Sequence, residues 1–419
     1  MAKGLKSKSG LKILPISNIF SIKATRFGLV VVYIDCIFNI LAIMNKFAVA
    51  FLPLLTAAYI LTDEFSGSEK SVKDYHVNQL DGPYVSYNGN QVFVKYILND
   101  HGNKLVKKDS MPVSEKANLS LNVLTDEEGK TFTVKLKKEL ENEKTEFSKV
   151  SKQFVVSDIE GNFGAFRKLL QGNNVIDASY NWTFGNGHLV LTGDFVDRGN
   201  QQTEVLWLIY SLEEKAKAAG GYVHYILGNH EIMNMSGDLR YLHAKYVEHA
   251  ILLNENITAL YGDNTELGRW LRTKNVIEKV GDVLFCHGGI SAAVNRMDLS
   301  ISKISKLVRP YYADSTYQYN TPEADTLYSD AGPFWYRGYY NGVVKASMMQ
   351  VDSTLSAYRV KHIATGHTVI ADTISALYNG KVLNTDVHHA KGHTEALLIE
   401  GGNFFRVTVA GEKIQIMKK

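Results

Sequence analysis

The chain has 419 residues, of which 45% are hydrophobic and 21% are charged, and its formal net charge is +3. This length allows one large domain and a smaller one, and the low net charge argues against a dedicated nucleic-acid-binding surface. Only two cysteines are present, Cys36 and Cys286, so the composition argues against a fold that depends on disulfides.

The first 61 residues contain two apolar runs and predict either export or membrane attachment. Residues 27–43 form the first run, and residues 47–61 form a second run that follows the basic start at Met44 and ends near small residues. The second unit is typical of a signal peptide, so we expect Met44 to be the biological start and residues 1–43 to be absent from the mature protein. The alternatives are a membrane anchor made of one or both runs and a buried helix. We therefore expect a protein that is periplasmic or membrane-anchored and faces outside the cytoplasm.

Residues 62–77 are polar and predict a linker. Apolar and polar residues then alternate in the segments 92–96, 119–123 and 132–136, and turn-forming pairs precede two of these segments. This pattern predicts a small antiparallel β domain over residues 78–138, in which each strand has one apolar face. We expect the domain to serve packing or positioning, with glycan or partner binding as the alternative. The charged segment 139–152 predicts a connector that is helical or disordered.

The remaining residues, 153–419, alternate short apolar runs with helical segments. The apolar runs lie at 154–156, 189–191, 223–227, 283–285 and 363–365, and helices are predicted around 166–170 and 205–212. Continuous apolar strands between helices indicate an α/β fold whose sheet is buried on both faces. In such folds, ligands bind beyond the carboxyl ends of the strands.

Each of these five runs is followed by polar residues suited to metal or phosphate. The segments are Asp158-Ile159-Glu160, Gly193-Asp194 with Asp197-Arg198, Gly228-Asn229-His230, His287-Gly288 and Gly366-His367. The glycines let the backbone turn sharply and bring side chains toward one point. One such loop is a weak signal, but five loops that carry Asp, Glu, Asn and His predict a dinuclear metal centre.

This series of loops resembles the calcineurin-like metallophosphoesterase superfamily over about residues 153–410, and within it the phosphoprotein-phosphatase type. The specific segments are Gly193-Asp194-Phe195-Val196-Asp197-Arg198-Gly199 and Gly228-Asn229-His230-Glu231. Residues 233–241 and 332–338 are similar to the Shewanella-like bacterial branch. The resemblance implies an α/β fold, a β-sandwich of mixed sheets flanked by helices, which here follows the small N-terminal antiparallel β domain.

The resemblance also implies a role for each polar residue of these loops. The metal ligands would be Asp158, Glu160, Asp194, Asn229, His287 and His367, with Asp194 bridging the two ions. His230, oriented by Asp197, would protonate the leaving oxygen or stabilise the nucleophile. Arg198 and Arg337 would bind the phosphate oxygens, because a guanidinium group fits them in a bidentate manner.

The first loop departs from the family pattern, which is Asp-x-His, because Glu160 stands at the histidine position. An oxygen ligand there favours hard cations over zinc, and the alternative is that Glu160 supports the site without binding metal. We therefore expect two divalent ions, manganese first, with iron, zinc and magnesium as alternatives. Asp238 and Arg240 follow a metal loop, and we expect them to bind substrate or to form a salt bridge with each other.

Two further groups are of interest near the end of the chain. We expect the histidines of the late polar loop to lie on the surface or at the rim of the cleft; they are His388, His389 and His393. The aromatic residues around the predicted phosphate-binding arginine are expected to be mainly core, with one or two able to stack on a phosphotyrosine ring; they are Phe334, Trp335, Tyr336, Tyr339 and Tyr340.

These observations support a phosphomonoester hydrolase that acts on serine, threonine or tyrosine of a phosphorylated protein or peptide. Hydrolysis of a small phosphoester or nucleotide is the alternative, because specificity lies in loops such as 234–280 and 311–345. A membrane-attached binding module with a vestigial site is a third reading. It would require the loss of a bridging or phosphate-binding residue, and none of these is missing from the sequence.

Overall fold

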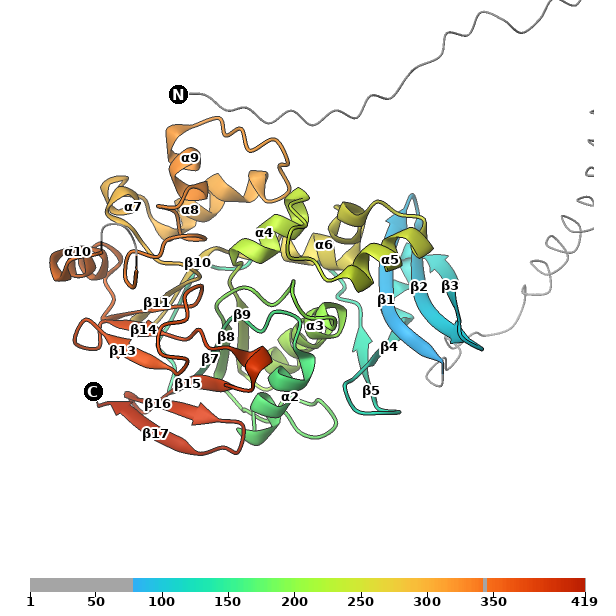
Figure 1. Cartoon of the computed structure of the whole chain (residues 1–419), viewed down its shortest axis with the longest axis horizontal. Coiled ribbons are helices and arrows are strands. Elements are labelled where there is room, and N and C mark those ends of the chain that lie inside the picture. Colours follow the sequence, from blue (N-terminus) through green and yellow to red (C-terminus); the bar gives the residue numbers. More distant parts are fainter. Residues whose placement is uncertain (1–77, 342–344, 419) are drawn as a thin grey trace, which may run out of the picture. The chain divides into compact units, whose positions relative to one another are not determined.

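The computed structural model describes residues 78–341 and 345–418, and all of them belong to one compact unit, Ser71–Lys419 (Figure 1). The predicted signal or anchor region (1–61) and the linker (62–77) lie outside the described residues, so both stay predictions. Within the residues that the structure describes, no helix combines the length and the apolar character that crossing a bilayer requires.

Two six-stranded mixed sheets form the centre of this unit. The first sheet has the order β17-β16-β15-β7-β8-β9. Its strands are β7 (Lys152–Val156), β8 (His188–Leu191), β9 (Tyr222–Tyr225), β15 (Glu395–Glu400), β16 (Asn403–Thr408) and β17 (Lys413–Met417). Strands β7, β8 and β9 are parallel, whereas β15, β16 and β17 extend the sheet in antiparallel fashion.

The second sheet has the order β13-β14-β12-β11-β10-β6. Its strands are β6 (Glu146–Phe147), β10 (Ile277–Val280), β11 (Val283–Cys286), β12 (His362–Thr365), β13 (Ser375–Leu377) and β14 (Val382–Asn384). Strands β11, β12 and β14 run parallel to one another. Their carboxyl ends therefore meet at one edge of the sheet, where polar loops can converge.

Side chains of both sheets pack against each other, which explains why the central strands are apolar on both faces. In β8, Val190 joins a cluster that includes Phe285 of β11 and Leu397 of β15, whereas Leu189 and Leu191 point into the cluster that contains the helices. All five side chains are fully buried. The predicted β-sandwich of mixed sheets flanked by helices is confirmed.

Nine α-helices and four short 3₁₀ helices are found in the described residues. The α-helices are α2 (Phe163–Gly172), α3 (Gln202–Ala218), α4 (Asn229–Ser236), α5 (Ala244–Leu253), α6 (Glu266–Leu271), α7 (Ala292–Arg296), α8 (Ile301–Val308), α9 (Pro322–Tyr328) and α10 (Met348–Tyr358). The 3₁₀ helices are η1 (Val113–Asn118), η2 (Ile257–Tyr261), η3 (Arg309–Tyr311) and η4 (His389–Lys391). The helices predicted around 166–170 and 205–212 are confirmed as α2 and α3.

The N-terminal residues form two small antiparallel sheets, in agreement with the alternating pattern. Strands β1 (Gln79–Asn88), β2 (Gln91–Asp100) and β3 (Asn103–Pro112) make one sheet, and β4 (Ser120–Leu124) pairs with β5 (Thr131–Lys135) in the other. Figure 1 shows β1–β3 in blue, next to α5 and α6.

These sheets share one continuous core with the large α/β part. The Phe132 ring of β5 stacks on Phe163 of α2 and on Tyr180, with ring centroids 6.0 and 5.2 Å apart. The indole Nε1 of Trp207 in α3 donates a hydrogen bond to the Pro83 carbonyl of β1 (2.9 Å). The β unit therefore packs as an integral layer of the fold, as its expected positioning role requires.

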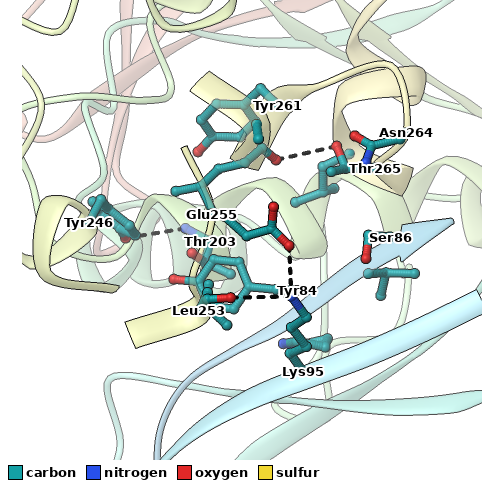
Figure 2. A pocket seen from close by; sticks show the side chains of 15 residues that line it. Tyr84, Ser86, Lys95, Thr203, Tyr246, Leu253, Glu255, Tyr261, Asn264 and Thr265 are labelled. Carbon is teal, nitrogen blue, oxygen red and sulfur yellow. Dashed lines mark hydrogen bonds and ion pairs between the residues drawn. The ribbon is translucent and has the colours of Figure 1, made fainter. Parts of the chain in front are cut away.

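A narrow cavity of about 40 Å³ remains between β1, α5 and η2, and Figure 2 shows its lining. The aromatic residues Tyr84, Tyr246 and Tyr261 line it, and the ion pair between Lys95 Nζ and Glu255 (2.7 Å) crosses from β2 to the chain after α5. The space is close to that of one or two water molecules, so it is a packing gap in the core and too small for a substrate.

The connector over residues 139–152 differs from the prediction of a helix or disorder. It runs extended and contributes β6, which pairs in parallel with β10. Its carbonyls at Glu143 and Lys144 accept hydrogen bonds from Asn275 Nδ2, and Lys274 Nζ pairs with the Glu143 carboxylate (3.0 Å). The charges that suggested a solvated helix are therefore used in contacts with the sheet.

Candidate metal centre

The polar loops after the parallel strands of both sheets meet at one edge of the sandwich. The Asp158 amide, after β7, donates to the Gly193 carbonyl after β8 (3.0 Å). In the second sheet, the Gly366 amide after β12 donates to the His287 carbonyl after β11 (2.9 Å). The two sheets are joined where the His367 amide donates to Asp158 Oδ2 (3.1 Å). Loops that are up to 209 residues apart in sequence are thus brought into direct contact.

Four of the predicted metal ligands share one centre. One ligand atom each from Asp194, His287 and His367 lies within 4.8 Å of the others, and all three side chains are buried. His287 Nε2 lies 2.9 Å from Asp194 Oδ2 and 3.0 Å from Asn229 Oδ1. The convergence that the sequence predicted is therefore present in the structure.

The chemistry of this cluster fits a divalent metal ion. His367 Nε2 is buried, and within the described part of the chain it has no hydrogen-bond partner. His287 donates from Nδ1 to the Thr192 carbonyl (2.8 Å), a contact that directs Nε2 toward Asp194 and Asn229, where a metal ion would bind. A Cβ atom on Gly228 would lie 2.2 Å from Asp194 Oδ1, so only glycine allows this approach. Carboxylate, amide and imidazole groups together are a donor set for manganese, iron or zinc.

The electrostatics of the cluster show how strongly its members interact. Burial, together with the charge of Asp194, raises the pKa of Asp158 to about 6. Burial would also raise the pKa of Asp194, but the imidazoles of His287 and His230 hold it well below its usual range. Burial would lower the pKa of His287, but Asp194, Asp158 and the hydrogen bond to the Thr192 carbonyl together raise it to about 10. Opposite charges thus stabilise the cluster, in a place where a metal ion would supply the positive charge.

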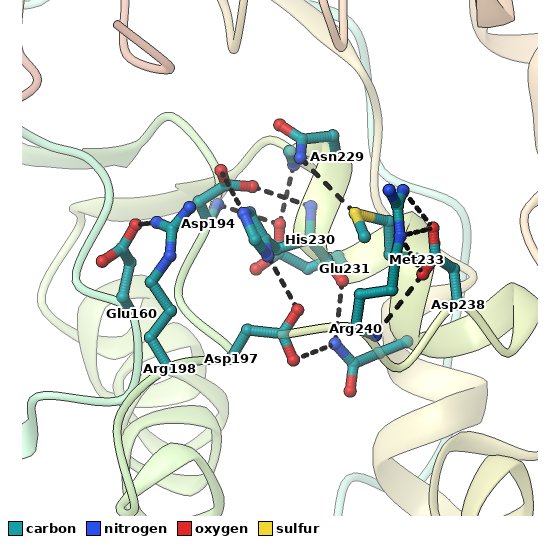
Figure 3. Close-up of polar contacts among 12 residues, drawn as sticks. Glu160, Asp194, Asp197, Arg198, Asn229, His230, Glu231, Met233, Asp238 and Arg240 are labelled. Carbon is teal, nitrogen blue, oxygen red and sulfur yellow. Dashed lines mark hydrogen bonds and ion pairs between the residues drawn. The ribbon is translucent and has the colours of Figure 1, made fainter. Parts of the chain in front are cut away.

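His230 and Asp197 form a second polar pair beside this cluster (Figure 3). His230 Nδ1 lies 2.7 Å from Asp197 Oδ2, and Asn234 Nδ2 donates to the other oxygen of Asp197 at 2.7 Å. His230 Nε2 lies 3.8 Å from Asp194 Oδ2, so this nitrogen faces the metal cluster. Burial would lower the pKa of His230, but Asp194 and Asp197 raise it above its ordinary value. The arrangement suits a histidine that holds and delivers a proton at Nε2.

The two predicted phosphate-binding arginines line a cavity of about 610 Å³ in front of the cluster. Arg198 lies against the Tyr241 ring, with 5.2 Å from its guanidinium carbon to the ring centroid. Arg337 donates from Nη1 to the His367 carbonyl (2.5 Å) and to Thr368 Oγ1 (2.9 Å). A cavity of this size, with two cationic groups beside buried carboxylates and imidazoles, can hold a phosphate group together with its leaving group.

Comparison with known proteins agrees with this geometry. Residues 152–371 match the family model described as calcineurin-like phosphoesterase. The chain belongs to the calcineurin-like phosphoesterase family. This phosphoesterase family binds metal ions, and the buried Asp194, His287 and His367 cluster lies where a metal site is expected.

Among individual relatives, the similarity to Shewanella-like phosphatases is confirmed. Solved structures of a cold-active protein tyrosine phosphatase from a psychrophilic Shewanella species are 34% identical, with a TM-score of 0.73, and the match covers 80% of this chain and 99% of that one. Shewanella-like protein phosphatase 2 of Arabidopsis thaliana is 25% identical over 299 residues, which is 60% of this chain and 75% of the relative. A symmetrical bis(5'-nucleosyl)-tetraphosphatase of Buchnera aphidicola is 29% identical over 158 residues, covering 37% of this chain and 49% of the relative.

Glu160 of the phosphoesterase lines the same cavity as Asp158 and Asp194, but in this structure its carboxylate is paired with an arginine. Its carboxylate forms an ion pair with Arg198 Nη1 (Figure 3), and the two side chains are 19% and 47% exposed. In this position Glu160 orients the guanidinium group at the rim of the cavity. The prediction that Glu160 binds metal stays a prediction.

Asp238 and Arg240 pair with each other, as one of the two sequence alternatives proposed. Arg240 Nη2 lies 2.7 Å from Asp238 Oδ2, the Arg240 side chain is 67% exposed, and neither residue lines the cavity. Figure 3 shows the pair on the far side of α4 from Glu160. Their predicted role in binding substrate draws no support from this placement.

The late histidines separate into rim and core positions. His388 lines the cavity and lies 3.0 Å from Asp372, and the more exposed His393 is 3.6 Å from the same carboxylate. The prediction of a surface or rim position was wrong for His389. That side chain is buried, and its Nε2 lies 3.0 Å from the Ser157 carbonyl, because η4 packs under the loop after β7.

The aromatic group divides in a similar way. Phe334, Tyr339 and Tyr340 are buried in the core, whereas Trp335 lines the cavity and its ring lies 5.8 Å from the ring of His367. Tyr241 also lines the cavity, and its ring lies 5.1 Å from that of His230. Tyr241 is the last residue of the segment 233–241, and no local pattern distinguishes it from its neighbours.

Glu231 is the last residue of the segment Gly228-Asn229-His230-Glu231, and no role was predicted for it from the sequence. It is fully buried at the start of α4 and accepts hydrogen bonds from the amides of Asp194 (2.9 Å), Phe195 (2.7 Å) and Gly228 (2.7 Å). It therefore ties the loop after β8 to the loop after β9. The spacing of Glu231 three residues after the N-cap glycine is the local signal that could have identified it.

Asp386 is a second residue that the sequence reasoning did not identify. It follows β14, it is only 5% exposed, and it lines the same cavity as Asp158 and Asp194. Burial and the charge of Asp158 raise its pKa well above its ordinary range. The loop of Asp386 lacks the glycine that marked the five loops found from the sequence, although Val382-Leu383-Asn384 is an apolar run of the same kind.

Proposed function

We propose that this chain is a metal-dependent phosphomonoester hydrolase that acts on phosphorylated proteins or peptides. The observation that carries the proposal is the convergence of Asp194, His287 and His367 within 4.8 Å, beside the paired His230 and Asp197. A phosphatase needs a centre that polarises phosphorus, a proton donor for the leaving oxygen and cationic groups for the phosphate. Each of these is present around one cavity.

The side chains divide this work between them. Bound divalent ions supply Lewis-acid polarisation of the phosphoryl group and activation of the attacking water. Asp197 holds the His230 ring so that Nε2 faces the reacting phosphate and can deliver a proton to the leaving oxygen. Arg198 and Arg337 hold phosphate oxygens as negative charge develops, since guanidinium groups bind them in a bidentate manner.

For the metals we propose two divalent ions, with Mn²⁺ as the first to test. Asp158, Asp194 and Asn229 offer oxygen ligands, which hard cations prefer, and His287 and His367 add imidazole nitrogens that suit Mn²⁺ better than Mg²⁺. Iron and zinc are the alternatives, because imidazole and carboxylate together also suit them.

For the substrate we propose phosphotyrosine in a protein or peptide, with phosphoserine and phosphothreonine as the related class. The 34% identity to a cold-active protein tyrosine phosphatase supports this choice. Trp335 and Tyr241 line the cavity and offer aromatic faces on which a phenyl ring can pack. Nucleotide hydrolysis is the second candidate, because the chain is also similar to a bis(5'-nucleosyl)-tetraphosphatase.

A substrate panel tests the proposal. The full chain, treated with EDTA and then supplied with Mn²⁺, should hydrolyse p-nitrophenyl phosphate and should show a higher kcat/KM for phosphotyrosine peptides than for phosphoserine peptides or nucleotides. Absence of Mn²⁺-dependent hydrolysis of all four would contradict the phosphatase assignment. A preference for dinucleoside polyphosphates would show that the substrate is a nucleotide and not a phosphorylated protein.

We also propose that the protein is exported or membrane-anchored, on the basis of the apolar runs at 27–43 and 47–61. N-terminal sequencing of the protein isolated from its native host tests this proposal. Retention of residues 1–43 in the mature protein would exclude Met44 as the biological start.

A further inference from the structure

A sixth loop reaches the metal centre, in addition to the five that the sequence identified. Strand β14 is parallel to β12, whose end carries His367, and Asp386 follows β14 after one intervening residue. Asp386 therefore occupies the same topological position as the other site residues, beyond the carboxyl end of a parallel strand.

Hydrogen bonds on the strand side fix the direction of this loop. The Thr385 amide donates to the Thr365 carbonyl (2.8 Å), and the Thr385 hydroxyl donates to Ser157 Oγ (3.2 Å). Asn384 Nδ2 donates to the Thr368 carbonyl (2.9 Å). Because the preceding residues are bonded to the loops that carry Asp158 and His367, the Asp386 side chain is held at the cavity that these loops line.

The Asp386 carboxylate has no partner of its own. It is only 5% exposed, and the described residues provide it with no hydrogen bond and no ion pair. An isolated carboxylate is costly to bury and is found in proteins mainly where a cation or a metal ion compensates it. Here it lines the cavity together with Asp158 and Asp194.

We propose that Asp386 is a metal ligand. It would bind the same ion as Asp158 and the bridging Asp194. The inference rests on the proposed metal-dependent function and adds a residue that the sequence did not assign to it. Glu160 is not available as this ligand in the structure, because its carboxylate is paired with Arg198. A third carboxylate beside Asp158 and Asp194 in this cavity would favour a hard divalent cation such as Mn²⁺.

Metal binding to the full chain tests the proposal, with Mn²⁺ as the probe. The variant is Asp386→Asn, and the matched control is Asp372→Asn, since Asp372 does not line the cavity and is paired with His388 and His393. Each protein is stripped with EDTA and titrated with Mn²⁺, with bound metal measured by mass spectrometry and free Mn²⁺ by electron paramagnetic resonance. The wild type and the control should each bind two Mn²⁺ ions. Asp386→Asn should bind one of them at least tenfold more weakly.

The thermal stability of the metal-free protein separates a ligand from a merely structural residue. In EDTA, Asp386→Asn should melt at the same or a higher temperature than the wild type, because Asp386 makes no hydrogen bond or ion pair with the described residues that the substitution could remove. Its increase in melting temperature on adding Mn²⁺ should be smaller than that of the wild type. A lower melting temperature in EDTA for both Asp386→Asn and Asp386→Ala would show a structural role and overturn the proposal.

The outcomes also separate this proposal from the proposed function. If the wild type binds two Mn²⁺ ions and hydrolyses p-nitrophenyl phosphate while Asp386→Asn binds both ions equally well, only the role of Asp386 is refuted. If the wild type neither binds Mn²⁺ nor hydrolyses phosphoesters, the metal-dependent function is refuted, and the role of Asp386 with it.

Discussion

The buried carboxylate of Glu231 provides a quantitative test of how the metal loops are held. Its Oε1 atom accepts from the Phe195 amide (2.7 Å) and the Tyr225 hydroxyl (3.0 Å), and its Oε2 atom accepts from the amides of Asp194 (2.9 Å) and Gly228 (2.7 Å). The substitution Glu231→Gln keeps the size and shape of the side chain but replaces one oxygen by an NH₂ group. If the NH₂ group replaces Oε2, it faces the amides of Asp194 and Gly228. If it replaces Oε1, the Tyr225 hydroxyl can rotate and accept from it, so only the Phe195 amide loses its acceptor.

The expected cost follows from this count. An unsatisfied buried donor costs about 1–3 kcal/mol, and the less costly orientation of the glutamine leaves one donor, the Phe195 amide, without its acceptor. Part of this cost is offset, because burial and the neighbouring charge of Asp194 raise the pKa of Glu231 and the substitution removes that repulsion. We expect a net loss of about 1–2 kcal/mol, against a typical total of about 5–15 kcal/mol.

Urea denaturation of the metal-free protein measures this loss of stability directly. The kcat with p-nitrophenyl phosphate should also fall, because the loops of Asp194 and Gly228 are both hydrogen-bonded to the Glu231 carboxylate. The exposed Glu412 provides an isosteric control, Glu412→Gln, which should leave both quantities unchanged. If Glu231→Gln unfolds at the same urea concentration as the wild type and the control, the carboxylate does not hold the loops and the reasoning fails.

Three other changes probe the site itself. Asp194→Asn should lose bound metal and more than about 100-fold in kcat/KM, because even residues that only support a metal ligand cost about 10–100-fold; full activity, or activity that survives EDTA, would contradict a metal-dependent mechanism. Asp197→Asn should move the basic limb of the pH–kcat profile to lower pH, because the raised pKa of His230 depends on the charges of Asp194 and Asp197 and activity is lost as His230 deprotonates. An unchanged limb would assign the proton to another group. Glu160→Gln should raise KM about two- to fivefold with little change in kcat, because a partly exposed ion pair contributes up to about 1 kcal/mol; loss of one Mn²⁺ equivalent would instead identify Glu160 as a ligand.

The sequence predicted those parts of the fold that depend on local patterns. Apolar runs that end in glycine and a polar residue marked β7, β8, β9, β11 and β12, and alternation marked β2, β4 and β5. These signals work because strand burial and sharp turns are local requirements of the chain. The convergence of their loops then follows from the parallel arrangement of the strands.

What could not be predicted depends on contacts between distant residues. The antiparallel strands β15, β16 and β17 complete the first sheet. They could not be predicted in the way the parallel strands were, because no polar site residue follows them. The connector is extended because Asn275 donates hydrogen bonds to two of its carbonyls. These carbonyls lie 131 and 132 residues before Asn275 in the sequence. His389 is buried under a loop that precedes it by 232 residues. No local pattern encodes these pairings.

The same distinction applies to the site. The pairing of Asp197 with His230 could be anticipated from the resemblance, and the structure places the two atoms 2.7 Å apart. The pairing of Glu160 with Arg198 and the approach of Asp386 to the cavity could not, because each depends on side-chain direction after the backbone has folded.

The shared core between the N-terminal sheets and the α/β part limits how this protein can be shortened. A chain that began at residue 139 would contain every residue of the metal centre, but it would leave the aromatic faces of Phe163 and Tyr180 exposed to water and Trp207 Nε1 without its acceptor. Such a fragment would present a contiguous apolar surface and should aggregate. Residues 78–138 therefore cover an apolar face of the α/β part, and the two should be produced together in one chain.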